Sequence, residues 1–169
     1  MSELRTNRIV PRDGLPSGSA GGIVQIRQTE HSSRVLYNGS SYSPGTLADG
    51  STGDYSITIT PTRTDSKILV SFNSMYDNNT ANQRVYITIY RSIGGGTASD
   101  IIGNRGLVEI WNPAQRIQST VMAQYLDSPG TVSPVTYTVY ARREASPGGD
   151  FYLGLYNNDK YMHAMEVSG

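Results

Sequence analysis

The stretches Tyr55-Ser-Ile-Thr-Ile-Thr-Pro61 and Lys67-Ile-Leu-Val-Ser-Phe72 lie on either side of a short polar turn, and they decide the fold class. In the first stretch, Tyr55, Ile57 and Ile59 alternate with hydroxyl-bearing side chains. This period of two is typical of a strand with one buried face. The pattern predicts a β protein.

Similar runs recur from residue 23 onward, separated by Gly, Pro, Asn and Asp at the spacing typical of a sandwich or barrel. Ten runs would overfill one sheet, so we expect two facing sheets. The clearest runs carry aliphatic side chains on one face and Tyr or Thr on the other, which we expect to meet solvent or a protein partner. Asn38-Gly39 predicts a type I′ hairpin turn, and residues 97–104 fit either a short helix or a loop. The predicted strands are 23–28, 34–42, 55–60, 67–75, 84–92, 107–111, 117–126, 135–143, 151–156 and 162–167.

Composition limits the function classes. The chain has 169 residues, which suits one domain with a short extension. It has no cysteine, which excludes disulfides, thiol nucleophiles and zinc–thiolate sites. Fourteen basic residues balance fourteen acidic ones, so the net charge predicts no binding to nucleic acid. No stretch resembles a signal peptide or reaches membrane-spanning length, so we expect no membrane insertion.

The first 22 residues differ from the rest of the chain. They contain scattered apolar positions, two prolines and the small-residue run Ser17-Gly-Ser-Ala-Gly-Gly22. Such a segment cannot bury enough apolar surface to fold alone. We therefore expect an extended arm with a flexible joint over residues 1–22 and a β-sandwich domain over residues 23–169.

The sequence contains no convincing catalytic constellation. His31 lies in a polar segment that resembles a loop, and His163 lies within the last predicted strand. No Gly-x-Ser-x-Gly elbow is present, so a serine hydrolase is disfavoured and two surface or interface histidines are the simpler interpretation. Most Asp residues fall at turns, where they usually form local hydrogen bonds. We predict no catalytic residue and no cofactor.

Glu166 is the acidic residue that stands out. It shares a strand face with Met162 and Ala164, so we expect it to be partly buried and to need an Arg, Lys or backbone donor as partner. The segments 77–79 and 157–159 offer oxygen ligands for calcium, but neither has the ligand spacing of an EF-hand. We predict no metal site.

Aromatic residues supply the candidate ligand contacts. Twelve Tyr stand against two Phe and one Trp, and tyrosine suits wet interfaces because it combines apolar area with a polar tip. Trp111 is interpreted either as a core anchor or as an exposed platform on which a sugar stacks. Core or subunit packing is the alternative role for all of these aromatics. The candidate contacts for a host glycan are Trp111, Tyr152, Tyr156, Asn157, Asn158 and Tyr161.

Several blocks, taken in order, resemble a known family. They are Leu4-Arg-Thr-Asn-Arg-Ile-Val-Pro-Arg12, Ile57-Thr-Ile-Thr-Pro-Thr-Arg-Thr-Asp-Ser-Lys-Ile-Leu-Val70, Ile89-Tyr-Arg91, Tyr125-Leu-Asp-Ser-Pro-Gly130, Val135-Thr-Tyr-Thr-Val-Tyr140 and Met165-Glu-Val167. In this order they are similar to the C-terminal domain of tail-fibre and other virion appendage proteins of bacteriophages, those of marine cyanophages in particular.

The resemblance implies an antiparallel jelly-roll β-sandwich of the tumour-necrosis-factor and C1q kind, assembled as a homotrimer, with an extended N-terminal arm. It implies no catalytic residues. The protein is then expected to fold in the bacterial host cytoplasm and to function in the virion, on the tail or capsid surface. Residues 1–22 are expected to dock to other virion proteins of the tail, baseplate or capsid, and host-surface glycan is a further expected partner. The predicted docking anchors are the apolar arm residues Leu4, Ile9, Val10 and Leu15.

Two alternatives stay open at this point. A capsid decoration or cement protein, such as a head fibre, would stabilise the shell without binding a receptor. The second alternative is a carbohydrate-active depolymerase, and the lack of a long parallel β-helix repeat argues against it. The chain also lacks a shaft, coiled-coil heptads and a Gly-X-Y repeat, which favours a short appendage over a long fibre.

Overall fold

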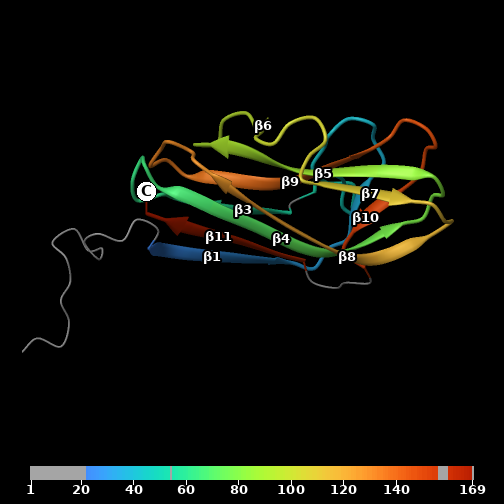
Figure 1. Ribbon diagram of the computed structural model, residues 1–169, viewed down its shortest axis with the longest axis horizontal. Coiled ribbons are helices and arrows are strands. Elements are labelled where there is room, and N and C mark those ends of the chain that lie inside the picture. The colour runs from blue at the N-terminus through green and yellow to red at the C-terminus, as the bar shows by residue number, and fades with distance from the viewer. Residues whose placement is uncertain (1–21, 54, 156–159, 169) are drawn as a thin grey trace, which may run out of the picture.

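The computed structural model describes residues 22–53, 55–155 and 160–168. Two antiparallel sheets face each other in this part of the chain, and it contains no helix (Figure 1). The predicted all-β sandwich is therefore confirmed. The arm residues Leu4, Ile9, Val10 and Leu15 lie outside the described residues.

Sheet A is organised around its longest strand, β4. On one side β4 pairs first with β11 and then with β10, and β1 and β2 lie beyond them. On its other side β4 pairs along its length with β8. The strands of sheet A are β1 (Ile23–His31), β2 (Val35–Tyr37), β4 (Lys67–Asn78), β8 (Ile117–Asp127), β10 (Phe151–Leu153) and β11 (Lys160–Val167).

Sheet B is organised around β5. This strand pairs with β9 on one side, and β3 lies beyond β9. On its other side β5 pairs with the short strands β6 and β7. The strands of sheet B are β3 (Ser56–Ile59), β5 (Gln83–Ile93), β6 (Ser99–Asp100), β7 (Val108–Asn112) and β9 (Val135–Arg143).

The core lies between the sheets and follows the alternation in the sequence. Tyr55, Ile57 and Ile59 from the stretch that decides the fold are all buried, as are Ile68 and Val70 of β4. In each strand, alternate side chains point into the space between the two sheets, so the aliphatic faces of the sheets pack against each other. The buried residues form one continuous cluster, as expected of a single domain.

The two ends of the sandwich differ. Gly22 and Ser168 meet at one end, where the Ser168 N–H donates to the Gly22 carbonyl at 2.9 Å and the Gly22 N–H donates to Ser168 Oγ at 3.1 Å. We call this the terminal end; the connection 128–134 also lies there (Figure 1). The connections 79–82, 113–116 and 144–150 lie at the opposite end, which we call the distal end.

Several local predictions differ from the structure. The predicted strand 34–42 is reduced to β2, because β2 pairs with the distant strand β10 and not with a hairpin neighbour. Neither Asn38 nor Gly39 has the positive φ that a type I′ turn needs. Residues 97–104 form a loop, one of the two predicted alternatives, apart from the two-residue strand β6, which pairs with β5. His31 belongs to β1 and not to a loop. The ninth predicted strand, 151–156, ends at Leu153, because Gly154 turns the chain with a φ of 82°.

Candidate functional site: the outer face of sheet A and the distal end

An apolar row crosses the outer face of sheet A. Ile26 of β1 pairs with Met165 of β11, Met165 pairs with Leu69 of β4, and Leu69 pairs with Leu126 of β8. Ile26 is 57% exposed and Leu126 is 49% exposed, so both ends of the row reach solvent. A row of four apolar side chains across four strands is unusual for a solvated sheet face, where polar residues are expected. We call Ile26, Met165, Leu69 and Leu126 the apolar row.

A shallow depression lies further along the same face. Met75, Met122 and Tyr161 contribute most of its apolar lining, and Asn73 and Thr120 contribute polar atoms. Met122 is the most exposed large hydrophobic side chain of the described residues, at 70%. A depression of this shape can receive an apolar side chain from another molecule.

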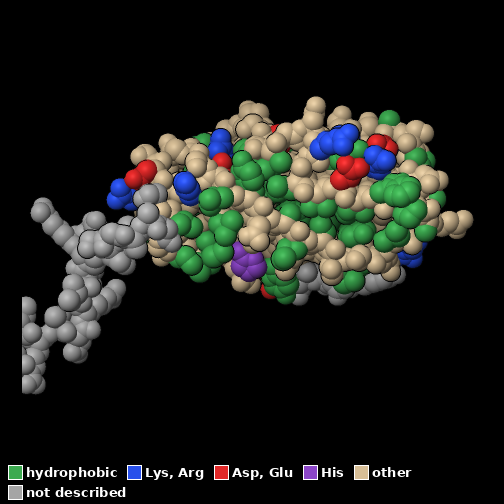
Figure 2. Space-filling view, viewed as in Figure 1, with side chains coloured by type: hydrophobic (Ala, Val, Ile, Leu, Met, Phe, Trp, Pro, Cys, Tyr) green, Lys and Arg blue, Asp and Glu red, His purple; other side chains and the backbone are tan. Residues whose placement is uncertain are grey.

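β8 forms a free edge of sheet A. Among the described residues it pairs with β4 only, so the backbone groups along its other side have no strand partner in that part of the chain. Residues 117–126 contain no charged side chain, Pro or Gly. Edge strands usually carry charges or Pro that prevent pairing with other chains. Figure 2 shows hydrophobic side chains gathered on the side of the molecule where β8 lies. This edge therefore lacks the usual protection against association.

A polar row separates the apolar row from the depression. It contains Gln28, His163, Ser71 and Gln124, in register across the same four strands. The ring Nε2 of His163 lies 3.2 Å from Oε1 of Gln28. The outer face of sheet A is therefore mixed, with apolar side chains and neutral hydrogen-bonding groups, which is the usual make-up of a protein interface.

The outer face of sheet B is covered by its own chain. The rings of Tyr90 and Tyr140 stack with centroids 3.9 Å apart. The Arg142 guanidinium lies over the rings of Tyr86, at 4.2 Å, and Tyr42, at 5.1 Å. Both Tyr42 and Arg142 also donate hydrogen bonds to the carbonyl of Asn104. The prediction that such a face meets solvent or a partner was therefore wrong for much of sheet B, because loops of the same chain pack onto it.

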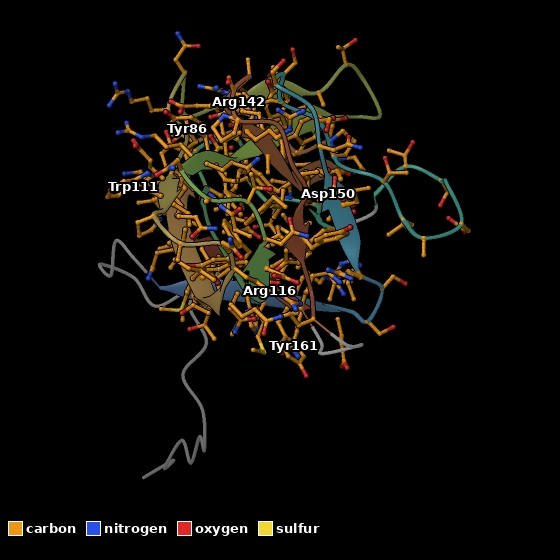
Figure 3. All side chains as sticks on the ribbon, turned by 90° about the vertical axis from the view of Figure 1, so that its right-hand side faces the viewer. Tyr86, Trp111, Arg116, Arg142, Asp150 and Tyr161 are labelled. Atoms are coloured by element: carbon orange, nitrogen blue, oxygen red, sulfur yellow. The ribbon has the colours of Figure 1, made fainter. Side chains whose placement is uncertain are left out.

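The sequence-predicted glycan contacts are not brought together. Trp111 is 56% exposed on the outer face of β7 in sheet B, whereas Tyr152 and Tyr161 lie on the outer face of sheet A. Figure 3 shows Trp111 and Tyr161 on different sides of the molecule. Tyr156, Asn157 and Asn158 lie outside the described residues. Trp111 is thus not a core anchor, and the described members of the set do not line one site.

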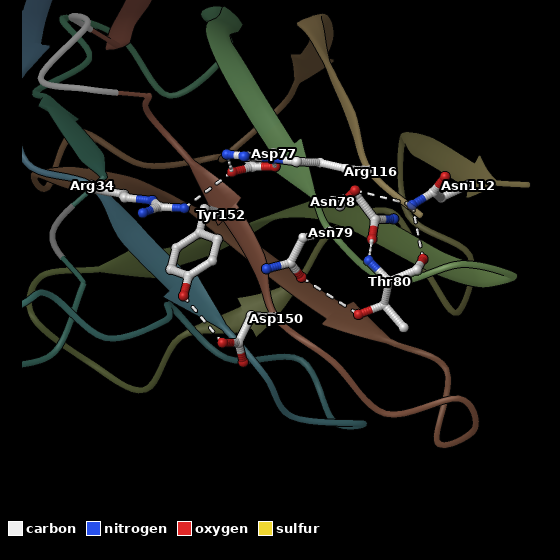
Figure 4. A network of polar contacts seen from close by, with 9 residues as sticks. All are labelled: Arg34, Asp77, Asn78, Asn79, Thr80, Asn112, Arg116, Asp150 and Tyr152. Atoms are coloured by element: carbon white, nitrogen blue, oxygen red, sulfur yellow. Dashed lines mark hydrogen bonds and ion pairs between the residues drawn. The ribbon is translucent and has the colours of Figure 1, made fainter. Parts of the chain in front are cut away.

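A charged cluster at the distal end was missed by the sequence analysis. Asp77 is buried, and Arg116 donates to both of its carboxylate oxygens, at 3.0 and 2.7 Å. Arg34 donates to Asp77 Oδ2 at 3.2 Å and lies flat over the ring of Tyr152, 3.4 Å from its centroid. The hydrogen bonds from Arg116 lower the pKa of the Asp77 carboxyl below its ordinary value, although burial opposes them. Figure 4 shows this cluster. No sequence signal links residues 34, 77 and 116, because the sheet order alone brings them together.

Amide side chains organise the loop beside this cluster. Nδ2 of Asn112 donates to the carbonyl oxygens of Asn78, at 3.0 Å, and Thr80, at 2.8 Å. Oδ1 of Asn112 accepts the N–H of Ala114 at 3.0 Å. One buried amide therefore holds two connections of the distal end in place (Figure 4).

Two buried carboxylates have structural partners. Glu166 is fully buried and accepts hydrogen bonds from the N–H and hydroxyl of Thr62, both at 2.7 Å, and from Nε2 of Gln25 at 2.6 Å. The expectation that Glu166 is buried with a backbone donor is confirmed. Burial raises the pKa of Glu166, but the hydrogen bonds that its carboxylate accepts outweigh burial, so the net pKa shift is downward.

Asp127, at the end of β8, is the second buried carboxylate. It accepts two hydrogen bonds from Nη1 of Arg91, at 2.8 and 2.9 Å, and one from the hydroxyl of Tyr137 at 2.7 Å. Burial raises the pKa of the Tyr137 phenol, and the Asp127 carboxylate raises it further. This triad ties β8 to β5 and β9 across the two sheets.

His31 contacts the backbone of the opposite sheet and has a structural role. Nε2 of His31 lies 2.9 Å from the carbonyl oxygen of Ser56, and Nε2 of Gln25 donates to the carbonyl of Thr60 at 2.6 Å. Both contacts join β1 to the β3 region across the open side of the sandwich.

Within the described part of the chain, no three His, Asp or Glu side chains gather into a metal-binding group. No helix in that part is long and apolar enough to cross a membrane.

Comparison with known proteins adds no relative. No model of a protein family matches the chain. A search of curated proteins also gave no match.

Proposed function

We propose that this chain is a non-enzymatic structural protein of a bacteriophage virion, a short homotrimeric tail fibre or appendage. The observation that carries the proposal is the contrast between the two outer faces of the sandwich. The outer face of sheet A has the exposed apolar row, the depression and the uncharged edge of β8. The outer face of sheet B is covered by its own tyrosines and loops. The outer face of sheet A is thus the better suited of the two to contact a second copy, although Trp111 is exposed on sheet B.

The strand order supports the jelly-roll part of the proposal. From β3 to β10 the chain crosses between the sheets at β3–β4, β4–β5, β7–β8, β8–β9 and β9–β10. The sheet orders β1-β11-β4-β8 and β3-β9-β5-β7 are those that a chain wound in two Greek keys produces. This winding agrees with the resemblance of the sequence to virion appendage domains.

The polarity of the sandwich supports the docking part. Gly22, the first described residue, lies at the terminal end. The distal end, with the connections 79–82, 113–116 and 144–150, is at the other end of the sandwich (Figure 1). A protein docked through its arm would therefore present the distal end to the surroundings, and three copies would add avidity to weak contacts with a host surface.

Deletion of residues 1–20 tests the docking role. We expect the shortened protein to remain a folded trimer, because the described contacts begin at Gly22. Phage particles assembled with the shortened protein should then lack it, as measured by mass spectrometry of purified particles. Incorporation at the level of the intact protein would refute the docking role of the arm.

A capsid decoration protein remains the competing virion role, because the same polarity suits a molecule that stands on a capsid. A density map of the intact particle separates the two roles by location. Density for the sandwich on the tail or baseplate supports the appendage, whereas density on the capsid lattice supports the decoration protein.

A further inference from the structure

One tryptophan side chain is exposed at the edge of sheet B. Trp111 is 56% exposed on the outer face of β7, which pairs with β5 only within the described residues. In that part of the chain no aromatic ring or cationic side chain stacks on the indole, and the indole N–H has no hydrogen-bond partner. Figure 3 shows Trp111 at the side of the molecule. The ring is therefore open to a ligand.

Charged side chains flank the indole. Arg84 of β5 is paired with Trp111 across the strands, and Glu109 lies two residues before Trp111 on the same face of β7. Nη1 of Arg84 donates to Oε1 of Glu109 at 3.3 Å, so the two side chains hold each other beside the indole.

Both members of this ion pair keep hydrogen-bonding capacity. Among the described residues, Nε and Nη2 of Arg84 donate to no acceptor. Oε2 of Glu109 lies 3.9 Å from Nη1 of Arg105, which is beyond hydrogen-bond distance. A donor group and an acceptor group are therefore available next to one exposed aromatic ring.

The apolar surface at this place is limited to the indole. A protein partner needs an interface core built from several apolar side chains. The other exposed large hydrophobic side chains of the described residues lie elsewhere, at the terminal end or in sheet A: Ile93, Val132, Ile23, Ile26, Met122 and Leu126. The surroundings of Trp111 therefore suit a small ligand with one apolar face and a polar rim.

We propose that Trp111, Arg84 and Glu109 form a binding site for a neutral pyranose ring. The C–H groups on one face of such a ring carry partial positive charge, and they pack against the negative face of the indole. Its hydroxyl groups both donate and accept, so they can donate to Oε2 of Glu109 and accept from Arg84. The placement of that sugar on a host surface rests on the proposed function, whereas the choice of a saccharide rests on the site itself.

The site stays open in the proposed assembly. The apolar row and the depression lie on the outer face of sheet A, and Trp111 lies on the outer face of sheet B. A trimer that buries the face of sheet A therefore leaves three copies of the indole exposed.

Tryptophan fluorescence of the purified full-length protein tests the site directly. Trp111 is the only tryptophan of the chain, so the tryptophan emission reports on this ring alone. The probes are cellotriose, lactose and maltotriose at millimolar concentrations, and sorbitol is the control polyol without a ring. We expect at least one of the three saccharides to change the emission in a saturable way and sorbitol to leave it unchanged. A flat response to all three saccharides, or an equal response to sorbitol, would overturn the proposal.

Calorimetric titration of variants assigns the binding to these residues. Trp111→Ala and Arg84→Gln should each weaken binding of the active saccharide by about tenfold or more. Arg63→Gln is the matched control, because Arg63 has similar exposure and forms an ion pair with Asp65 in the connection between β3 and β4. Unchanged binding in Trp111→Ala, or equal loss in Arg63→Gln, contradicts the site.

Sedimentation velocity of Trp111→Ala separates the saccharide site from a contact between subunits. The variant should remain assembled like the wild type, and dissociation would show that Trp111 faces a second copy instead. The fluorescence titration uses the wild-type protein, so it decides the matter even where a variant fails to fold. All these experiments use isolated protein, so a negative result leaves the virion assignment to be judged by particle incorporation, and loss of incorporation would not affect the saccharide result.

Discussion

Met122→Ala should weaken self-association far more than it weakens folding. Met122 is 70% exposed on the outer face of β8, so truncation of its side chain removes little of the hydrophobic core within one subunit. Burial of a whole Met side chain is worth about 1.5–3 kcal/mol. Burial of the exposed 70% in an interface is then worth about 1–2 kcal/mol for each copy, and about 3–6 kcal/mol for a trimer. Since each 1.4 kcal/mol is tenfold, the trimer association constant should fall by about 10²–10⁴.

Sedimentation velocity over a range of protein concentrations measures this change. The wild type should sediment as a trimer, and Met122→Ala should shift to monomer at concentrations at which the wild type stays assembled. Trp111→Ala is the control, because it removes a larger side chain of similar exposure, 56%, from the outer face of sheet B. The reasoning is refuted if Met122→Ala assembles like the wild type or if Trp111→Ala is the variant that dissociates.

Three further predictions concern the buried polar groups. Tyr137→Phe removes a hydrogen bond to the buried Asp127 carboxylate and should lower the free energy of unfolding by about 1.5–3 kcal/mol in urea titrations. Tyr140→Phe, at a half-buried position on the outer face of sheet B, should change it by less than about 0.5 kcal/mol. Burial raises the pKa of Tyr137 and of Tyr55, so both stay protonated in the fold. Their contribution to stability should be constant below about pH 10 and should then fall by about 1.4 kcal/mol per pH unit for each; a flat stability profile between pH 10 and 11 would contradict this. Glu166→Gln places an amide donor against groups that already donate, and it should lower the free energy of unfolding by about 1–3 kcal/mol at pH 7, as measured by thermal unfolding. Because the pKa of Glu166 is lowered in the fold, the stability that its carboxylate supplies is lost as the pH falls below about 4. The difference in stability between the variant and the wild type should therefore disappear at that pH.

Sequence alternation predicted those strands that bury one face along their whole length. The run 135–143 coincides with β9, because its alternate residues Val135, Tyr137, Val139 and Ala141 all enter the core. The same alternation identified the partnered burial of Glu166, because its neighbours on the face, Met162 and Ala164, are apolar and buried. The local alternation of side chains is therefore enough to predict a strand that buries one face along its whole length.

The sequence-based predictions of strand ends and turns were wrong where residues distant in the sequence determine the local structure. β4 continues to Asn78, past the predicted end at residue 75, because Asp77 is neutralised by Arg34 and Arg116 from other strands and loops. Asn38-Gly39 forms no hairpin because β2 finds its partner in β10, more than a hundred residues later. The apolar row could not be read from the sequence for the same reason. Its four members come from four strands, and each looks like an isolated hydrophobic residue until the sheet order is known.

The symmetry of assembly follows from how far the apolar surface extends. Pairing of two β8 edges would be antiparallel and two-fold, so it would form a dimer that buries the edge of β8 and leaves the rest of the face exposed. Yet the apolar row continues across β4 and β11 to Ile26 on β1, three strands away from that edge and 57% exposed. Only a contact over the face buries the whole row. Placing the β8 edge of one copy on the face of the next joins different surfaces, and such a contact forms a ring when its rotation closes and an open filament when it does not. The position of Ile26 therefore favours a contact over the face, as in the proposed trimer, over an edge-paired dimer.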